Sequence, residues 1–465
     1  MKRAGFAYGA LALLASVAFL SGQSGRTYDG NHVWWDPGDG GILPWEEDYS
    51  DPTGQITILN TTGFIHTRNH AFFEPLGVNG RACVTCHQPS NAMSVSAASA
   101  RSRWTGTPRK DPLFAAIDGS NCPDLPQGAV SSHSLLLDRG LFRISLPWPP
   151  KSTDAAALQP EFRIEVLRDP TGCNQSPIYG IDGKNQAVSV YRRPRVAANL
   201  RHVIAGPGGT SFMADSREPS LRPQAINAAM IHEQAEAAPS SEQIRQIIDF
   251  ETQIYVAQSS DIRGGLLDEK TGPGSLGPEN LSAAGSGLPE AFSFAVWKKP
   301  GKGEDRGVQR EFRASVARGS DVFFGRQIQL RDAALVTCAS CHKAGTTRWM
   351  DVGTTNVDIT SNPTALGAPD LPLFRITCKG SAPPHPLLGR VIFTQDPGRA
   401  LISGKCADVG SIVVPQLRGL AARAPYFSNG TATSLRDVVE FYDKRFGIRY
   451  TEQEKQDLVN FLSAL

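Results

Sequence analysis

Two short stretches decide how the rest of this sequence is interpreted: Cys83-Val84-Thr85-Cys86-His87 and Cys338-Ala339-Ser340-Cys341-His342. Each has the Cys-x-x-Cys-His spacing of a c-type haem site, where both thiols add to the porphyrin and the adjacent His binds the iron. Neither has a second Cys or His pair at zinc-finger spacing, and a thioredoxin-like site would use a single motif without the His. The sequence predicts two covalently bound haem c groups, held by Cys83, Cys86 and His87 and by Cys338, Cys341 and His342.

The first residues have the pattern of an export signal. Lys2 and Arg3 precede an apolar run from Phe6 to Leu20, and a small polar stretch follows. The run is short for a membrane span, which takes about 20 apolar residues, although an uncleaved anchor is the alternative. We expect residues 1–24 to be a signal peptide. The mature protein would be periplasmic with no stable membrane span, because c-type haem is attached on that side of the membrane.

Four of the eight cysteines remain after the motifs are assigned: Cys122, Cys173, Cys378 and Cys406. Two lie in each half of the chain, and export places them in an oxidising compartment. We predict the disulfides Cys122–Cys173 and Cys378–Cys406. Four cysteines allow three pairings, and free buried thiols are the alternative.

Composition and patterning divide the chain without indicating a nucleic-acid partner. The net charge is only +2 and no basic block appears. Residues 25–60 are rich in Gly, Pro, Asp and Trp and predict a surface arm. Residues 111–196 contain alternating or β-branched segments that predict a small sheet. An apolar stripe predicts helix within 218–258, and the Gly/Pro/Ser-rich stretch 264–308 predicts a linker.

The last part of the chain has the layout of a small cytochrome c domain. A helical run from Glu311 to Phe324 precedes the second motif, and a closing helix begins at a capping box formed by Thr451 and Glu454. We therefore expect a mainly α fold with two cytochrome c-like haem domains. The expected boundaries are an N-terminal domain at 25–263 with a β-rich insertion at about 111–196, a linker at 264–308, and a C-terminal domain at 309–465.

Three stretches of the C-terminal half closely resemble bacterial di-haem cytochrome c peroxidases and their MauG-type relatives: 414–420, 424–430 and 435–442. The run Asp215-Ser216-Arg217, with Gln224 after it, is similar to a weakened form of that family's Trp-Asp-Gly-Arg segment. Together with the two motifs, the resemblance covers most of the chain from about residue 65 onward, apart from the β-rich insertion. It is specific for the superfamily and uninformative about the substrate.

The resemblance implies different roles for the two haem groups. The N-terminal one, with His87 as proximal ligand, would react with hydrogen peroxide, and the C-terminal one, with His342, would pass electrons to it. The family's distal Glu falls at Gln234 in this sequence. Because Gln cannot transfer protons, His232, Glu233 and Gln234 together are the candidate distal residues.

Other positions of the family pattern differ or stay open. The family's Trp between the haem groups falls at Ala214, which cannot relay an electron. The aromatic residues that could replace it are Phe212, Tyr191 and Trp349. Tyr442 stands where MauG-type enzymes have a Tyr as sixth ligand of the C-terminal haem. The alternatives are that Tyr442 only packs on an amphipathic helix, or that Met350 is the sixth ligand. The family also holds calcium between its domains, but no acidic loop of clear spacing appears here.

Three functions follow from this resemblance. The first is an exported peroxidase that reduces hydrogen peroxide with electrons from a small donor protein, a cytochrome c or a cupredoxin. The second is a MauG-type enzyme that oxidises a protein or organic substrate, which Tyr442 and the missing distal Glu favour. The third is a non-catalytic di-haem electron carrier with both irons six-coordinate. We expect the first.

Overall fold

The computed structural model describes residues 26–29, 32–107, 110–151, 158–204, 212–283, 291–298, 307–329, 335–342, 354–355, 359–361 and 367–465. The predicted signal peptide, Trp349 and Met350 lie outside these residues. None of the helices within the described ranges is both long enough and apolar enough to cross a membrane.

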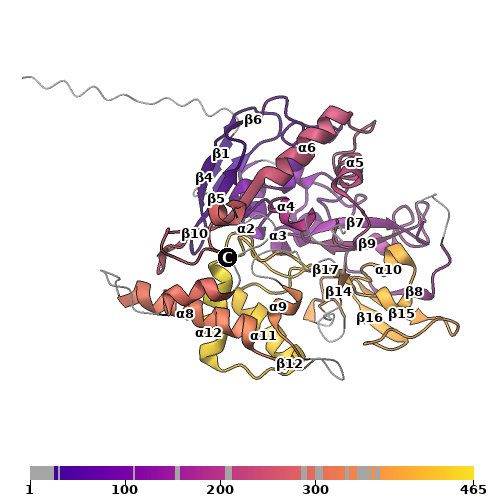
Figure 1. Ribbon diagram of the computed structural model, residues 1–465. Coiled ribbons are helices and arrows are strands. Elements are labelled where there is room, and N and C mark those ends of the chain that lie inside the picture. The colour runs from indigo at the N-terminus through magenta and orange to yellow at the C-terminus, as the bar shows by residue number, and fades with distance from the viewer. Residues whose placement is uncertain are drawn as a thin grey trace, which may run out of the picture.

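The segment before the first motif forms strands and buries side chains such as Trp35 and Ile56, so the prediction of a surface arm at 25–60 is wrong. The strands are β1 (Arg26–Asp29), β2 (His32–Trp35), β3 (Ile42–Leu43), β4 (Glu46–Ser50), β5 (Gly54–Asn60) and β6 (Ile65–His66). β4 and β5 join β10 (Ile254–Asp261) and β11 (Gly265–Leu266) in an antiparallel sheet of order β11-β10-β5-β4. This sheet lies beside α6 in Figure 1. Ile56 and Ile58 of β5 are buried in the core of this region with Phe72 and Phe250.

The first motif forms the short helix α1 (Cys83–Cys86). The other helices of the N-terminal half are α2 (Ala97–Gly106), α3 (Ser134–Arg139), α4 (Leu200–Ile204), α5 (Leu221–His232) and α6 (Ser241–Gln253), with the 3₁₀ segments η1 (Pro89–Asn91), η2 (Pro112–Phe114), η3 (Val130–His133) and η4 (Cys173–Gln175). α6 begins at a capping box made by Ser240 and Gln243, and it buries Ile244, Ile247 and Phe250. The predicted helical stripe stops at Gln253, because the next residues pair with β5 as β10.

The predicted β-rich insertion forms three strands, and both halves of the chain build the lobe around them. β7 (Phe142–Pro147) pairs with β9 (Ala187–Arg192). β8 (Phe162–Arg168) pairs with β15 (Leu373–Cys378), which pairs with β16 (Val391–Thr394). Side chains from both halves share one buried core that includes Leu146, Phe162, Val188, Phe374 and Ile376. We call these five strands the middle lobe; β8, β15 and β16 lie together in Figure 1.

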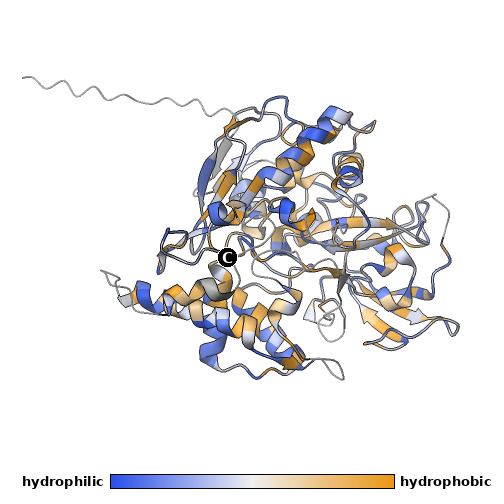
Figure 2. Cartoon of the chain, in the orientation of Figure 1, coloured by the Kyte–Doolittle hydropathy of each residue, from blue (hydrophilic) through white to orange (hydrophobic). Residues whose placement is uncertain are grey.

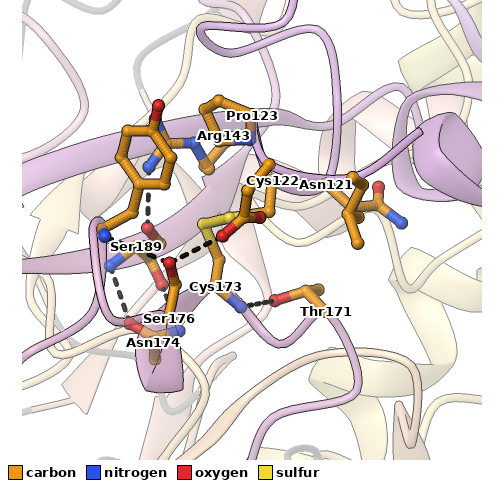
Figure 3. The surroundings of a disulfide bond; sticks show 12 residues. Asn121, Cys122, Pro123, Arg143, Thr171, Cys173, Asn174, Ser176 and Ser189 are labelled. Atoms are coloured by element: carbon orange, nitrogen blue, oxygen red, sulfur yellow. Dashed lines mark hydrogen bonds between the residues drawn. A yellow bond between two sulfur atoms is a disulfide. The ribbon is translucent and has the colours of Figure 1, made fainter. Parts of the chain in front are cut away.

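Both predicted disulfides are present, and Cys378–Cys406 belongs to the buried core of this lobe. The Cα atoms are 5.2 Å apart in Cys122–Cys173 and 5.8 Å apart in Cys378–Cys406. Figure 3 shows the first of them. Beside it, the Asn174 side chain donates to the peptide oxygen of Ser189 of β9 and accepts from its peptide nitrogen, at 3.0 and 2.8 Å. Hydrogen bonds therefore join the segment at Cys173 to β9, and the disulfide joins it to Cys122.

The second motif lies in a helical region near the C-terminus. Its elements are α7 (Pro278–Ala283), η5 (Ala291–Trp297), α8 (Gly307–Gly325), α9 (Cys338–Cys341), α11 (Leu435–Phe446) and α12 (Glu452–Ser463), with the short strands β12 (Ile328–Gln329), β13 (Leu335–Val336), β14 (Thr354–Thr355) and β17 (Ile412–Val413). α10 (Ala400–Ser403) and η8 (Cys406–Asp408) pack on the middle lobe. α8 and α12 pack on each other, and Figure 2 shows both carrying many hydrophobic residues. They touch at Gly319, where a Cβ atom would overlap the peptide oxygen of Asp457. α12 begins at the predicted capping box, with Thr451 as the N-cap.

The fold is mixed helix and sheet, so a mainly α layout is not confirmed. The strands that the sequence did not reveal are β1 to β6 before the first motif, β10 to β13 between the two motifs, and β14 to β17 after the second. The division into an N-terminal domain at 25–263, a linker at 264–308 and a C-terminal domain at 309–465 stays a prediction. The pairing of β8 with β15 joins residues from either side of that linker.

Candidate active site

The first motif is a one-turn helix whose reactive groups face a cavity. Cys83 and Cys86 are free thiols, and both line this cavity together with His87. The peptide oxygen of Met93 lies 3.1 Å from His87 Nδ1. Because a carbonyl only accepts, Nδ1 carries the proton and Nε2 keeps its lone pair. Burial lowers the pKa of His87 to about 4, so the neutral ring has the form that binds iron.

The second motif lies in the wall of the same cavity. Cys338, Cys341 and His342 all line it. Burial lowers the pKa of His342 to about 4, with a smaller opposing effect from the peptide oxygen of Pro415. Burial raises the pKa of both cysteines, so they are thiols at neutral pH. The Cys338 sulfur lies 3.8 Å from the hydroxyl oxygen of Tyr450.

One continuous cavity of about 760 Å³ connects the two motifs. Pockets for small ligands and cofactors usually have volumes of about 300–1,000 Å³ and mostly apolar walls. The apolar side chains of this wall come from both halves of the chain and include Phe142, Val196, Phe323, Leu420, Val439 and Leu458. Such a wall fits the apolar faces of porphyrin rings.

Three arginines of this wall have no ion-paired carboxylate among the described residues: Arg193, Arg195 and Arg423. Their guanidinium groups donate to peptide oxygens instead, as Arg193 does to Val95 at 2.7 Å and Arg195 to Val413 at 2.9 Å. Burial lowers the pKa of Arg193 to about 9, and that of Arg195 and Arg423 to about 10. The charge of Arg423 lowers the first two pKa values further. Cations that are partly removed from water and repel one another are stabilised by anions, which the propionates of bound haem would supply.

His232, a predicted distal residue, lines this cavity and is oriented by a buried carboxylate. Its Nδ1 lies 2.6 Å from Asp118 Oδ2, and Asp118 is also ion-paired with Arg81. Burial raises the pKa of Asp118, but the charge of Arg81 and the hydrogen bond from His232 outweigh that effect and lower it. The carboxylate therefore holds the proton of His232 on Nδ1, and Nε2 remains the proton acceptor. Sequence reasoning missed Asp118 and Arg81, since Asp118 is 114 residues from His232 and no local pattern links them.

The other two predicted distal residues lie in different surroundings. Glu233 is buried in the cavity wall, where Oε2 accepts from the peptide nitrogen of Leu76 at 3.0 Å and Oε1 lies 3.4 Å from the Cys83 sulfur. Burial raises the pKa of Glu233 to about 7. Gln234 is exposed, and its side chain accepts from Asn79 at 3.3 Å. The structure thus brings His232 and Glu233 to the cavity and leaves Gln234 outside its wall.

Glu251 is a further carboxyl group of the cavity wall that the sequence did not single out for chemistry. It lies on α6 and is buried. Its Oε2 atom has no hydrogen-bond partner among the described residues. Burial alone raises its pKa to about 8. The sequence shows only that Glu251 falls within the region 218–258 where an apolar stripe predicts helix, and this pattern does not show what that helix packs against.

The positions with implied redox roles are divided between the cavity and the middle lobe. Tyr442 of α11 lines the cavity, and burial raises its pKa, as do the nearby thiols of the second motif. Ala214 and Phe212 also line it. Tyr191 instead donates its hydroxyl to the peptide oxygen of Asn121 in the middle lobe. Phe212 is therefore the described aromatic candidate that borders the cavity.

Clusters of three or more His, Cys, Asp or Glu side chains that could hold a metal ion do not occur within the described ranges. The imidazoles of the two motifs are instead single ligands of the kind that iron in a porphyrin needs. The donor set and the unpaired cations of the cavity therefore fit haem.

Comparisons with known proteins identify relatives of part of the chain. No family model matches it. Cytochrome-c peroxidase IdrP1 of Pseudomonas sp. (strain SCT) is 31% identical over 148 residues, which cover 28% of this chain and 36% of that protein. Cytochrome-c peroxidase IdrP2 of Denitromonas iodatirespirans is 32% identical over 137 residues, covering 28% and 35%. The match thus spans about a third of each of these relatives.

A solved structure is similar over a larger share of the chain but only weakly. A variant of the di-haem peroxidase BthA from Burkholderia thailandensis has 13% identity and a TM-score of 0.35, covering 85% of this chain and 83% of that one. A likeness at this level carries no argument by itself. The partial matches to cytochrome-c peroxidases and the two haem motifs support a resemblance of this chain to the bacterial di-haem cytochrome c peroxidase superfamily.

Proposed function

We propose that this chain is an exported di-haem peroxidase that reduces hydrogen peroxide to water with electrons from a small redox protein. The observation that carries the proposal is a single cavity lined by both motifs and by His232, whose ring Asp118 orients. Peroxide reduction needs an iron that peroxide can reach, a group that transfers a proton at the peroxide, and a second redox centre that supplies electrons. The residues that would serve these functions line this one cavity.

The residues that would hold the cofactors are those of the two motifs and three arginines of the cavity wall. Cys83 and Cys86 would form the thioether bonds of one haem c, Cys338 and Cys341 those of the other, with His87 and His342 as proximal ligands. When bound, the haem irons supply the redox chemistry, and the protein controls their ligands and surroundings. The guanidinium groups of Arg193, Arg195 and Arg423 would neutralise propionates. Calcium between the domains remains an expectation from the family alone.

His232 is the best placed residue to move a proton between the peroxide oxygens. With its Nδ1 proton held by Asp118, Nε2 can accept a proton from one oxygen of peroxide and return it to the other. Glu233, whose pKa burial raises to about 7, lies in the same wall. Gln234, the position of the family's distal Glu, has neither the chemistry nor the location for this role.

The donor protein would deliver its electrons through the C-terminal haem. A small cytochrome c or cupredoxin is the class of donor that the family resemblance suggests. Phe212 borders the cavity that both motifs line, whereas Ala214 offers no ring for an electron relay. We leave the relay residue unassigned, because electrons can also tunnel directly through a packed interior.

Tyr442 favours a second candidate function, that of a MauG-type enzyme that oxidises a protein or organic substrate. Burial raises the pKa of its hydroxyl, and the charges of Cys338 and Cys341 raise that pKa further. Iron binding would reverse that effect and stabilise the phenolate. An anionic phenolate ligand stabilises ferric over ferrous iron, which suits the oxidation of a substrate better than the acceptance of electrons from a donor of high potential.

The proposal is tested by the optical spectrum of the purified holoprotein before and after stoichiometric hydrogen peroxide. A high-spin band that peroxide abolishes is expected, because the haem at His87 is proposed to keep an open position. Replacement of the ligand by His87→Ala should abolish this reaction. Catalytic peroxide consumption with a reduced cytochrome or cupredoxin distinguishes the peroxidase from the MauG-type enzyme. Low-spin spectra that peroxide leaves unchanged, in both resting and half-reduced protein, would contradict both and support an electron carrier.

A further inference from the structure

The proposed reaction needs more protons than His232 can supply. Peroxide reduction follows H₂O₂ + 2 H⁺ + 2 e⁻ → 2 H₂O, and both electrons come from the small donor protein. His232 takes a proton from one peroxide oxygen and returns it to the other, so it adds no proton from outside. The remaining protons must come from groups at the cavity that hold them at neutral pH.

Glu251 has the surroundings of such a group. Its side chain lines the cavity, yet the residue is only 5% exposed. The Oε2 atom is buried without a hydrogen-bond partner among the described residues. An ionised carboxylate at such a place would lose its hydration without compensation, whereas a neutral acid loses much less. The geometry therefore favours a protonated Glu251.

The charged groups around Glu251 do not stabilise an anion. Those on α6 itself are largely exposed and pair with one another: Glu242, Arg245 and Asp249. Cys83 of α1 lies close enough to Glu251 for the carboxylate charge to raise the pKa of the Cys83 thiol. Glu233, which follows α5, lies 3.4 Å from the same sulfur atom. On α4, His202 is bonded through Nε2 to the peptide oxygen of Leu281, and Arg201 acts on Tyr255. No side chain among these offers Glu251 a positive partner.

We propose that Glu251 is a proton donor of the cavity, which with Glu233 supplies the protons that the second water molecule requires. The inference rests on the proposed function. In each transfer a carboxyl O–H bond breaks and an O–H bond forms on the peroxide-derived oxygen, while electrons arrive from the donor protein. The two carboxylates then regain protons from solvent. His232 thus moves a proton between the peroxide oxygens, whereas Glu251 and Glu233 supply the protons for the second water molecule.

The pH dependence of this donor follows from its burial. Because the pKa of Glu251 is raised to about 8, the side chain is protonated below that pH and loses its proton as pH rises through it. Turnover that depends on Glu251 should therefore fall on the alkaline side. Glu233, with a pKa of about 7, would lose its proton first.

The test compares Glu251→Gln with wild-type holoprotein, and uses Glu242→Gln on the exposed face of the same helix as the matched control. Infrared spectra of the wild type at pH 7 should show a protonated-carboxyl band that decreases as pH rises through about 8. Glu251→Gln should lack this component, and Glu242→Gln should retain it. At saturating peroxide and donor, kcat of Glu251→Gln should fall by about 10²-fold. The rate of the first reaction with peroxide, which depends on His232, should change less than about twofold.

An infrared band that is unchanged in Glu251→Gln, or full turnover by that variant, would overturn the inference. If the variant does not fold, the wild-type titration decides, and the absence of a carboxyl band with a midpoint near pH 8 contradicts it. If the wild-type protein does not consume peroxide, the proposed function is refuted, and so is the transfer of protons from Glu251 to a peroxide-derived oxygen. The infrared result still shows in that case whether Glu251 is a neutral acid, so the two failures are distinguishable.

Discussion

Replacing Asp118 by Asn should separate the structural role of this residue from its role at His232. The substitution keeps the shape of the side chain and removes its charge. Asn presents an amide N–H as well as an oxygen, and the N–H can donate to His232 Nδ1 in place of the bond that Asp118 accepts at 2.6 Å. The proton of the ring would then lie on Nε2, which could no longer accept a proton from peroxide.

Two magnitudes follow from the contacts. Arg81 would lose its ion pair but keep hydrogen bonds to the peptide oxygens of Pro112 and Leu113, both at 2.7 Å. The cost in unfolding free energy should therefore be about 3 kcal/mol, at the low end for removal of one partner of a buried pair. The rate with peroxide should fall by about 10³-fold, because the wrong tautomer of a carboxylate-oriented His has effects of that order.

The assays are urea unfolding of the holoprotein and stopped-flow reaction with peroxide, with the exposed Asp138→Asn as control. The pKa of Asp118 is lowered in the folded protein. Its ion pair therefore stabilises the fold above the pKa of the unfolded chain, and this contribution is lost as pH falls through the folded value. The stability deficit of the variant should persist from pH 5 to 8 and shrink below about pH 4. A variant that reacts with peroxide at the wild-type rate would refute the role assigned to His232.

Three further changes have defined outcomes. If Tyr442 binds iron, Tyr442→Phe should change the low-spin spectrum of one haem and leave the other unaltered; an unchanged spectrum removes Tyr442 from the ligands. Gly319→Ala should lower the unfolding free energy by about 3 kcal/mol, because the added Cβ would overlap the peptide oxygen of Asp457. Urea unfolding measures this loss, with Gly307→Ala as the control, since a Cβ at Gly307 meets nothing within 4 Å. Replacing both Cys378 and Cys406 by Ser should cost about 4 kcal/mol for a loop of 28 residues, and a variant with wild-type unfolding free energy would show that this disulfide does not stabilise the fold.

Local sequence patterns predicted the parts of the fold that depend on neighbouring residues. The capping box at Thr451, the helix that contains Glu311, and the strands of 142–192 are all present. Ile254 and Tyr255 were instead assigned to a helix, because they continue an apolar stripe that α6 had begun. They belong to β10, whose partner β5 comes about two hundred residues earlier in the chain. β-branched and aromatic residues suit a strand once that partner exists.

The candidate site divides in the same way. The haem motifs and the region of His232 were visible in the sequence, because their spacing or their position relative to Gln224 carries the information. Asp118 was not, because it meets His232 only through the folded chain. The choice between Glu233 and Gln234 likewise depends on a single turn of backbone after α5. Gln234 has a φ of 55° there, and this turn leaves its side chain exposed.

The sheet shared by both halves imposes an order on the folding of this protein. Arg375 of β15 reaches Glu165 of β8 across 210 residues of sequence, so the middle lobe cannot close until residues from both halves of the chain are available. The first Cys-x-x-Cys-His motif emerges long before that point. If haem is attached to it as proposed, loading of the first haem would precede lobe closure. A chain whose second half is delayed would present open strand edges, which are targets for proteases and sites of aggregation.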